Sequence, residues 1–181
     1  MTGAVPLVPG RSCDGCTMCC KLMRVAALDK PRGQWCVHCD IGAGCKIYDR
    51  RPEACLAFYC AYRLTTELDE RWKPALSHLL VRYDERRISV FVDADDAKAW
   101  KREPYFTQIK TWAAQAAPHR GQVIVWRGLD AYAIFPDREK FLGPVREDQR
   151  MVNAYTQTPQ GERMDVVVMD ASDPRIAGSE R

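Results

Sequence analysis

All nine cysteines of this 181-residue chain lie between positions 13 and 60, and the rest of the sequence contains none. The positions are Cys13, Cys16, Cys19, Cys20, Cys36, Cys39, Cys45, Cys55 and Cys60. Thiols grouped in this way indicate a metal ion, an iron–sulfur cluster or a set of disulfides. We expect metal, because an odd number of thiols would leave one unpaired in a disulfide framework.

The rest of the composition is that of an ordinary soluble globular protein. We expect a cytoplasmic location, where thiols stay reduced. The N-terminus has no charged segment followed by an apolar run, so it does not resemble a secretory signal. No apolar stretch approaches the roughly 20 residues that span a bilayer, and we expect no membrane partner. The net charge of +3 is too small to predict a nucleic-acid partner.

The cysteine spacing explains how metal would be held. A Cys-x2-Cys step places two sulfurs around one tight turn, within reach of one ion at about 2.3 Å for zinc. The steps are Cys13/Cys16, Cys16/Cys19 and Cys36/Cys39. Four thiolates suffice for a zinc ion and also for an iron–sulfur cluster. Nine could fill two four-ligand sites with one spare, or one site with bridging sulfurs, and all nine are candidate ligands. Zinc is slightly favoured over an iron–sulfur centre.

The motifs of residues 11–63 resemble those of the YkgJ-type cysteine-cluster proteins. They are Cys13-x2-Cys-x2-Cys-Cys20, Trp35-Cys36-x2-Cys39, Gly44-Cys45-Lys-Ile-Tyr48-x2-Arg51-Pro52-x2-Cys55 and Phe58-x-Cys60. Members are described as zinc- or iron-chelating domains, so the resemblance implies a metal-chelating function. The most widespread family pattern matches Cys13, Cys16, Cys19, Cys20, Cys36, Cys45 and Cys55. Cys39 and Cys60 correspond to a narrower subgroup, and Leu56 stands where the family often has Arg.

The resemblance also implies alternatives to simple chelation. Members have been called iron–sulfur oxidoreductases, and flagellin lysine methylases are similar in the same motif. An iron–sulfur oxidoreductase or group-transfer enzyme is therefore the first alternative. A zinc-ribbon-like nucleic-acid adaptor is the second, and the sequence leaves open whether the chain is an enzyme.

We predict an α+β fold in which the cysteine-rich segment packs on antiparallel β-hairpins with one or two helices. The expected parts are an irregular arm (1–12), a cysteine-rich metal-chelating region (13–64), a hairpin-rich region (75–170) and a polar tail (171–181). Alternating apolar residues predict hairpins at 79–83/88–92, 123–126/132–135 and 151–156/164–169. Helices are expected at about 52–64 and at 94–117, the second divided at Pro104.

A few other side chains near the cysteines are candidates for a role. His38 is more simply a neighbour of a metal site than a ligand. Arg51 is expected to offset thiolate charge, because a four-thiolate zinc site carries a net charge near −2. The acidic run Asp93, Asp95 and Asp96 is expected to cap a helix rather than catalyse.

Overall fold

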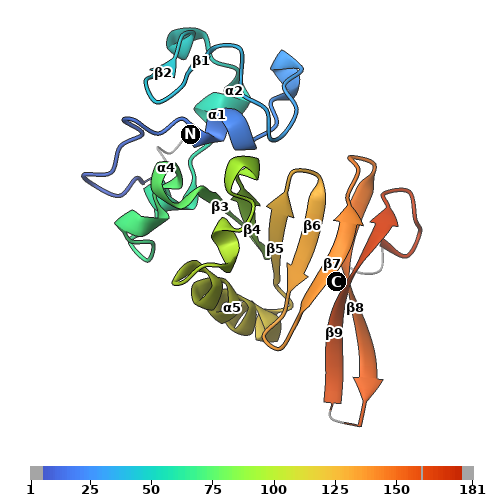
Figure 1. Ribbon diagram of the computed structural model, residues 1–181. Helices are drawn as coiled ribbons and strands as arrows, with labels where there is room; N and C mark the ends of the chain where they lie inside the picture. The colour runs from blue at the N-terminus through green and yellow to red at the C-terminus, as the bar shows by residue number, and fades with distance from the viewer. Residues whose placement is uncertain (1–5, 160, 177–181) are drawn as a thin grey trace.

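The computed structural model describes residues 6–159 and 161–176, and the chain adopts the predicted α+β fold (Figure 1). A five-stranded sheet carries a layer of short helices and loops at one end, and a long hairpin extends beyond it. The first five residues of the predicted arm and the last five of the predicted tail lie outside the described residues. No helix in the described part of the chain is both long and apolar enough to cross a membrane.

The sheet contains two of the predicted hairpins. Its strands, in spatial order, are β3 (Leu79–Asp84), β4 (Arg87–Val92), β5 (Gln122–Arg127), β6 (Asp130–Ile134) and β7 (Glu139–Pro144). Both hairpins are antiparallel as predicted, and β4 and β5 run parallel between them, so the sheet as a whole is mixed. β7 was not predicted, because this half-buried edge strand lacks a strong apolar alternation.

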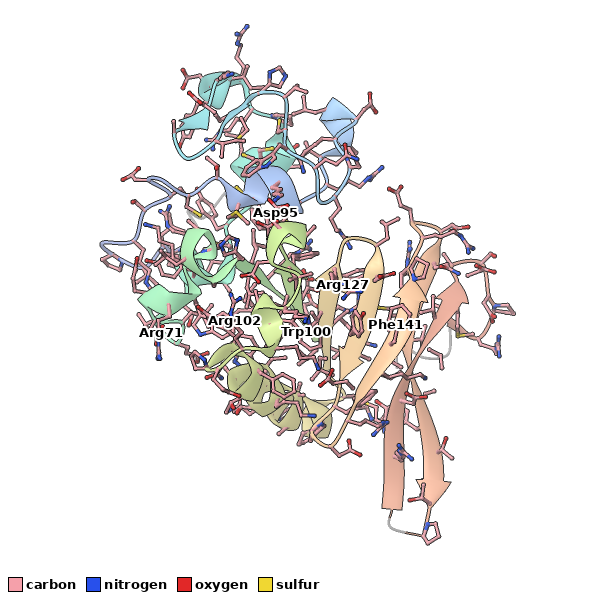
Figure 2. The ribbon with its side chains drawn as sticks, in the orientation of Figure 1. Arg71, Asp95, Trp100, Arg102, Arg127 and Phe141 are labelled. Carbon is pink, nitrogen blue, oxygen red and sulfur yellow. The ribbon has the colours of Figure 1, made fainter. Side chains whose placement is uncertain are left out.

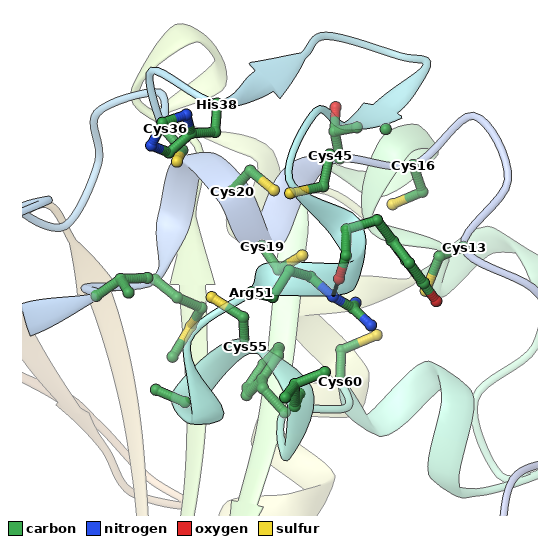
Figure 3. A pocket seen from close by; sticks show the side chains of 18 of the residues that line it. Cys13, Cys16, Cys19, Cys20, Cys36, His38, Cys45, Arg51, Cys55 and Cys60 are labelled. Atoms are coloured by element: carbon green, nitrogen blue, oxygen red, sulfur yellow. Dashed lines mark hydrogen bonds between the residues drawn. The ribbon is translucent and has the colours of Figure 1, made fainter. Parts of the chain in front are cut away.

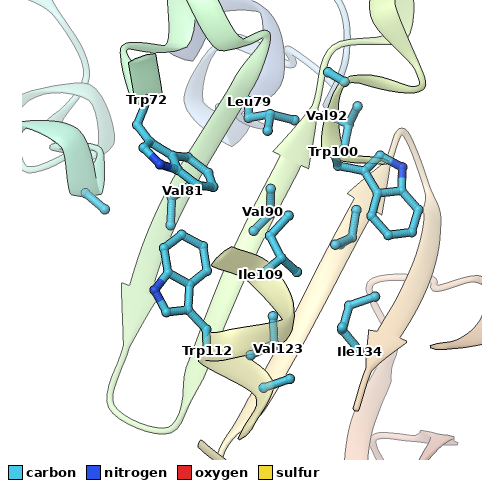
Figure 4. Packing of buried hydrophobic residues seen from close by; sticks show 14 of the residues in the cluster. Trp72, Leu79, Val81, Val90, Val92, Trp100, Ile109, Trp112, Val123 and Ile134 are labelled. Carbon is cyan, nitrogen blue, oxygen red and sulfur yellow. The ribbon is translucent and has the colours of Figure 1, made fainter. Parts of the chain in front are cut away.

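One face of the sheet is covered by α5 (Tyr105–Ala116), which connects β4 to β5. Three tryptophans, Trp72, Trp100 and Trp112, pack with valines of the sheet in the core of this face (Figure 4). The predicted helix at 94–117 exists only from Tyr105 onward. Its first part forms two 3₁₀ turns, η4 (Ala94–Asp96) and η5 (Ala99–Lys101), and a third, η6 (Ala117–His119), follows α5.

The other face receives the third hairpin and the cysteine-rich segment. The hairpin strands β8 (Gln149–Thr158) and β9 (Gly161–Asp170) are longer than predicted. Met151 of β8 packs on this face beside Phe91 and Trp126. Met18 and Leu22 join the same cluster from the cysteine-rich segment. This second core therefore attaches the cysteine-rich segment to the sheet.

The cysteine-rich layer and the connection to the sheet consist of short elements. They are α1 (Met18–Leu22), η1 (Ala26–Leu28), β1 (Cys39–Asp40), β2 (Gly44–Cys45), η2 (Tyr48–Arg50), α2 (Glu53–Leu56), α3 (Ala61–Leu64), η3 (Glu70–Trp72) and α4 (Pro74–Ser77). The single helix predicted for 52–64 is wrong. The chain leaves the helix after Leu56 and re-enters one at Ala61, and extended backbone at Cys60 precedes the second helix. Leu68, in the predicted connection, is fully packed in the core of the sheet.

A buried ion pair fixes α1 to the end of β4. Lys21 Nζ lies 2.5 Å from Asp93 Oδ1 and 2.6 Å from Asp95 Oδ2. The Lys21 and Asp93 side chains are 6% and 4% exposed, whereas Asp95 is 77% exposed. Figure 2 shows Asp95 next to α1. Asp93 also accepts a hydrogen bond from the backbone of Asp95, so the predicted capping role is confirmed at this residue.

We expect Asp93→Asn to reduce the free energy of unfolding by about 3 kcal/mol, because it leaves the Lys21 ammonium buried without its buried counter-charge. Asp95→Asn removes the exposed partner of the same lysine and should cost at most about 1 kcal/mol. Urea unfolding of both variants measures the difference. Equal losses would show that Lys21 does not depend on the buried carboxylate.

Candidate metal centre

The cysteine-rich segment surrounds a cavity of about 910 Å³ where a small domain would have its core (Figure 3). Among the apolar side chains of residues 13–60, only Met18, Leu22 and Val25 are buried. All three belong to or follow α1, which faces the sheet. Eight of the nine cysteines line the cavity, and all nine are free thiols. The interior of the segment is therefore lined by thiols together with half-buried apolar side chains such as Met23, Ile47 and Phe58.

Tight turns and short helices bring these thiols together. Cys16 donates its backbone N–H to the carbonyl of Cys13 at 2.8 Å, and Cys39 donates to that of Cys36 at 2.9 Å, so two of the three Cys-x2-Cys steps form the expected turns. Cys39 also pairs with Cys45 across β1 and β2. Gly42, in the turn between these strands, has φ +78°, a conformation that favours glycine.

Two further contacts close the ring of segments around the cavity. The backbone N–H of Cys36 donates to the carbonyl of Cys20 at 3.0 Å and ties the middle loop to α1. α2 carries Cys55, and Cys60 precedes α3. The break between these two helices lets Cys55 and Cys60 point to different parts of the cavity (Figure 3).

Six thiols form what we call the larger thiol set: Cys19, Cys20, Cys36, Cys39, Cys45 and Cys55. A hydrogen bond with Cys19 and burial raise the pKa of Cys20. Burial, together with the Cys20 thiol, raises the pKa of Cys39 to about 11. Burial and the thiols of Cys20, Cys36 and Cys45 likewise raise the pKa of Cys55. Cys39 is the one cysteine that does not line the cavity, but it hydrogen-bonds to the sulfur of Cys20.

The other three thiols, Cys13, Cys16 and Cys60, form the smaller thiol set. Burial raises the pKa of Cys60 to about 11, and the nearby Cys13 and Cys16 thiols contribute. Burial also raises the pKa of Cys16, to which Cys13 adds. These three residues lie on the same side of the cavity in Figure 3, away from Cys36.

Positive charges that the sequence did not single out lie close to both sets. Lys30 is 6% exposed and donates to the backbone carbonyls of Lys21, Met23 and Pro31. Burial lowers the pKa of Lys30, whereas the thiols of the larger set act in the opposite direction. Arg63 Nη1 donates to Cys13 Sγ at 3.0 Å. No short-range pattern marks either residue, because both approach the thiols through the tertiary fold.

The other candidate residues near the cysteines differ in their position relative to the cavity. Arg51 lines the cavity and stacks on Tyr48, with its guanidinium 3.5 Å from the ring centroid. Burial raises the pKa of Cys55, and the positive charge of Arg51 opposes this increase. His38 also lines the cavity beside Cys36 (Figure 3). Arg11, in the arm, donates to three backbone carbonyls and fastens the arm to α3 and the segment after it.

The donor set matches zinc and iron in chemistry, since thiolates bind both metals well. In the described part of the chain, no three Cys, His, Asp or Glu side chains already stand in position to hold one ion. An ion would therefore need the thiols around the cavity to rotate toward it. Such rotations are local, because the sulfurs lie at the ends of short side chains around a shared space.

No protein-family model, no curated protein and no solved structure matches this chain. The residues of the cavity are therefore the basis for any functional proposal.

We expect Lys30→Met to lower the free energy of unfolding of the metal-free protein by about 3 kcal/mol, since buried carbonyls lose a charged donor. The lost charge should also weaken metal binding at the larger thiol set. Lys46→Met removes the same charge from an exposed position on the cavity wall and should change stability by about 0.5 kcal/mol or less. Urea unfolding and metal titration compare the two variants, and similar effects would contradict the role of Lys30.

Proposed function

We propose that this chain binds a thiophilic metal, zinc or iron, through its clustered cysteines. The observation that carries the proposal is the cavity, which is lined by eight cysteines in a segment with almost no buried apolar side chains. The nine thiols are the proposed ligands, drawn from the larger and the smaller thiol sets. The proposal includes iron bound as an iron–sulfur cluster.

Metal binding would stabilise a segment that has little else to stabilise it. The helices α1, α2 and α3 have five, four and four residues. Helices this short are unstable in isolation. A structural metal contributes on the order of 10 kcal/mol in small domains that fold around it. We place the protein in the cytoplasm, where its thiols would remain reduced and able to bind the metal.

The size of the cavity favours a second candidate function. A space of about 910 Å³ is much larger than one ion and has room for a polynuclear cluster. The larger thiol set also has more sulfurs than the four that a cubane cluster requires. An iron–sulfur oxidoreductase or group-transfer enzyme is therefore the alternative to simple chelation. Brown protein with broad visible absorption after anaerobic purification would favour it, and colourless protein containing zinc would favour chelation alone.

We expect the metal-loaded protein to melt several degrees above the metal-free protein, because a ligand that binds only the folded state stabilises it. The effect should be concentrated in residues 13–60, so amide hydrogen exchange should slow in this segment and change little in β4 and β5. Calorimetry and hydrogen exchange on both forms measure this. Identical melting and exchange would contradict the proposal.

Metal uptake should release protons at pH 7, because thiols must ionise before they bind metal. The pKa values of Cys39 and Cys60 are about 11 in the metal-free protein, so both thiols carry their protons at neutral pH. The apparent metal affinity should therefore rise with pH and fall as the solution is acidified. Titration with zinc in a weakly buffered solution containing a pH indicator measures the released protons. Uptake without proton release would exclude these thiols as ligands.

A further inference from the structure

The smaller thiol set has its own group of hydrogen-bond donors. Cys16 accepts hydrogen bonds from the backbone N–H groups of Met18 and Ala75. Cys60 accepts from backbone N–H groups at the start of α3. Donors that point at a sulfur favour its thiolate form and accompany metal-bound thiolates.

The third member of this set is held by a cation. Cys13 Sγ accepts a hydrogen bond from Arg63 Nη1 at 3.0 Å, and the arginine follows Cys60 on α3. Arg63 therefore contacts two members of the set, Cys13 through its guanidinium and Cys60 through its backbone N–H. The thiols of the larger set have a different cation beside them, Lys30.

The following inference rests on the proposed metal binding. We propose that the cavity holds metal at two positions, and that the metal at the smaller thiol set keeps an open coordination site. A tetrahedral ion takes four ligands, and a site with three protein ligands leaves the fourth position to a ligand from solution. Cys13, Cys16 and Cys60 supply three thiols. The larger thiol set contains six, enough to complete the coordination of its own ion or cluster without an outside ligand.

The surroundings of the open site favour a small anion as its ligand. Arg63 supplies a guanidinium group with several N–H donors. Its Nε atom is buried and has no hydrogen-bond partner among the described residues. Cys13 is exposed, so the position is accessible from solvent. An anion bound to the metal would lie close to the guanidinium of Arg63, whose Nη1 contacts Cys13.

Cobalt-loaded protein with azide as the probe tests this inference. Cobalt replaces zinc or iron at thiolate sites and reports its ligands by visible absorption. We expect azide to change the cobalt spectrum of the unaltered protein. Arg63→Met should weaken azide binding about tenfold or more, because a charged donor is lost.

Cysteine variants then locate the azide-sensitive ion. Cys60→Ala should remove about one cobalt ion per chain together with the azide response, and the ions of the larger set should remain. Cys13→Ser at an exposed position provides a second variant that leaves the packing unchanged. Cys55→Ala is the matched control, because it should reduce binding at the larger set and preserve the azide response. Far-ultraviolet circular dichroism verifies that every variant keeps the sheet.

The outcomes separate this inference from the proposed function. If Cys60→Ala and Cys55→Ala each abolish all cobalt binding, the thiols form one site and the two-position proposal is wrong. If the wild-type spectrum does not respond to azide, the coordination is closed and the open site is wrong. Either result leaves metal binding intact, whereas a wild-type protein that binds no cobalt would overturn the proposed function and this inference with it.

Discussion

The structure depends on the cavity that residues 13–60 surround, which eight thiols and several half-buried apolar side chains line. A segment of this length normally needs apolar side chains, disulfides or metal to remain folded. Here Met18 and Leu22 pack on the sheet, whereas Val25 and eight of the nine thiols line the cavity. Packing against the sheet thus anchors one side of the segment, whereas on its other side the cysteines line the cavity. Metal is the ligand that suits such a lining, because reduced thiols bind it and the cavity gives it space.

The sheet supplies a platform that does not need the cysteines. Its larger core lies on the face covered by α5 and is built mainly from the strands, α5 and three tryptophans. α1 joins this platform to the cavity, since Lys21 pairs with Asp93 while its neighbours Cys19 and Cys20 belong to the larger thiol set. Lys30, Arg51 and Arg63 surround the thiols with positive charge. Negative charge on several thiolates would be offset at short range by these cations.

The sequence predicts the parts of the fold that repeat a short pattern. Alternation of apolar residues identified β3 with β4, β5 with β6, and β8 with β9. The same reasoning missed β7, whose residues carry little alternation, and the parallel pairing of β4 with β5, which depends on the path of α5. The sequence pattern also predicted one helix where the structure has α2 and α3, because no residue in it indicates the break before Cys60.

The cavity was predictable in its composition but not in its organisation. The cysteine spacing predicted a shared site and the turns at Cys13–Cys16 and Cys36–Cys39. It did not group Cys60 with Cys13, because their contact arises from the position of α3 beside the arm. The pairing of Lys21 with Asp93 and the burial of Lys30 arise in the same way, from segments that meet only after folding.

The central claim is that thiolates from separate segments converge on metal. X-ray absorption at the edge of the metal found in anaerobically purified protein tests it directly. We predict a first shell dominated by sulfur at about 2.3 Å, with three to four sulfur atoms for each ion. A first shell made only of oxygen and nitrogen, or a purified protein without metal that takes none up, would contradict the account.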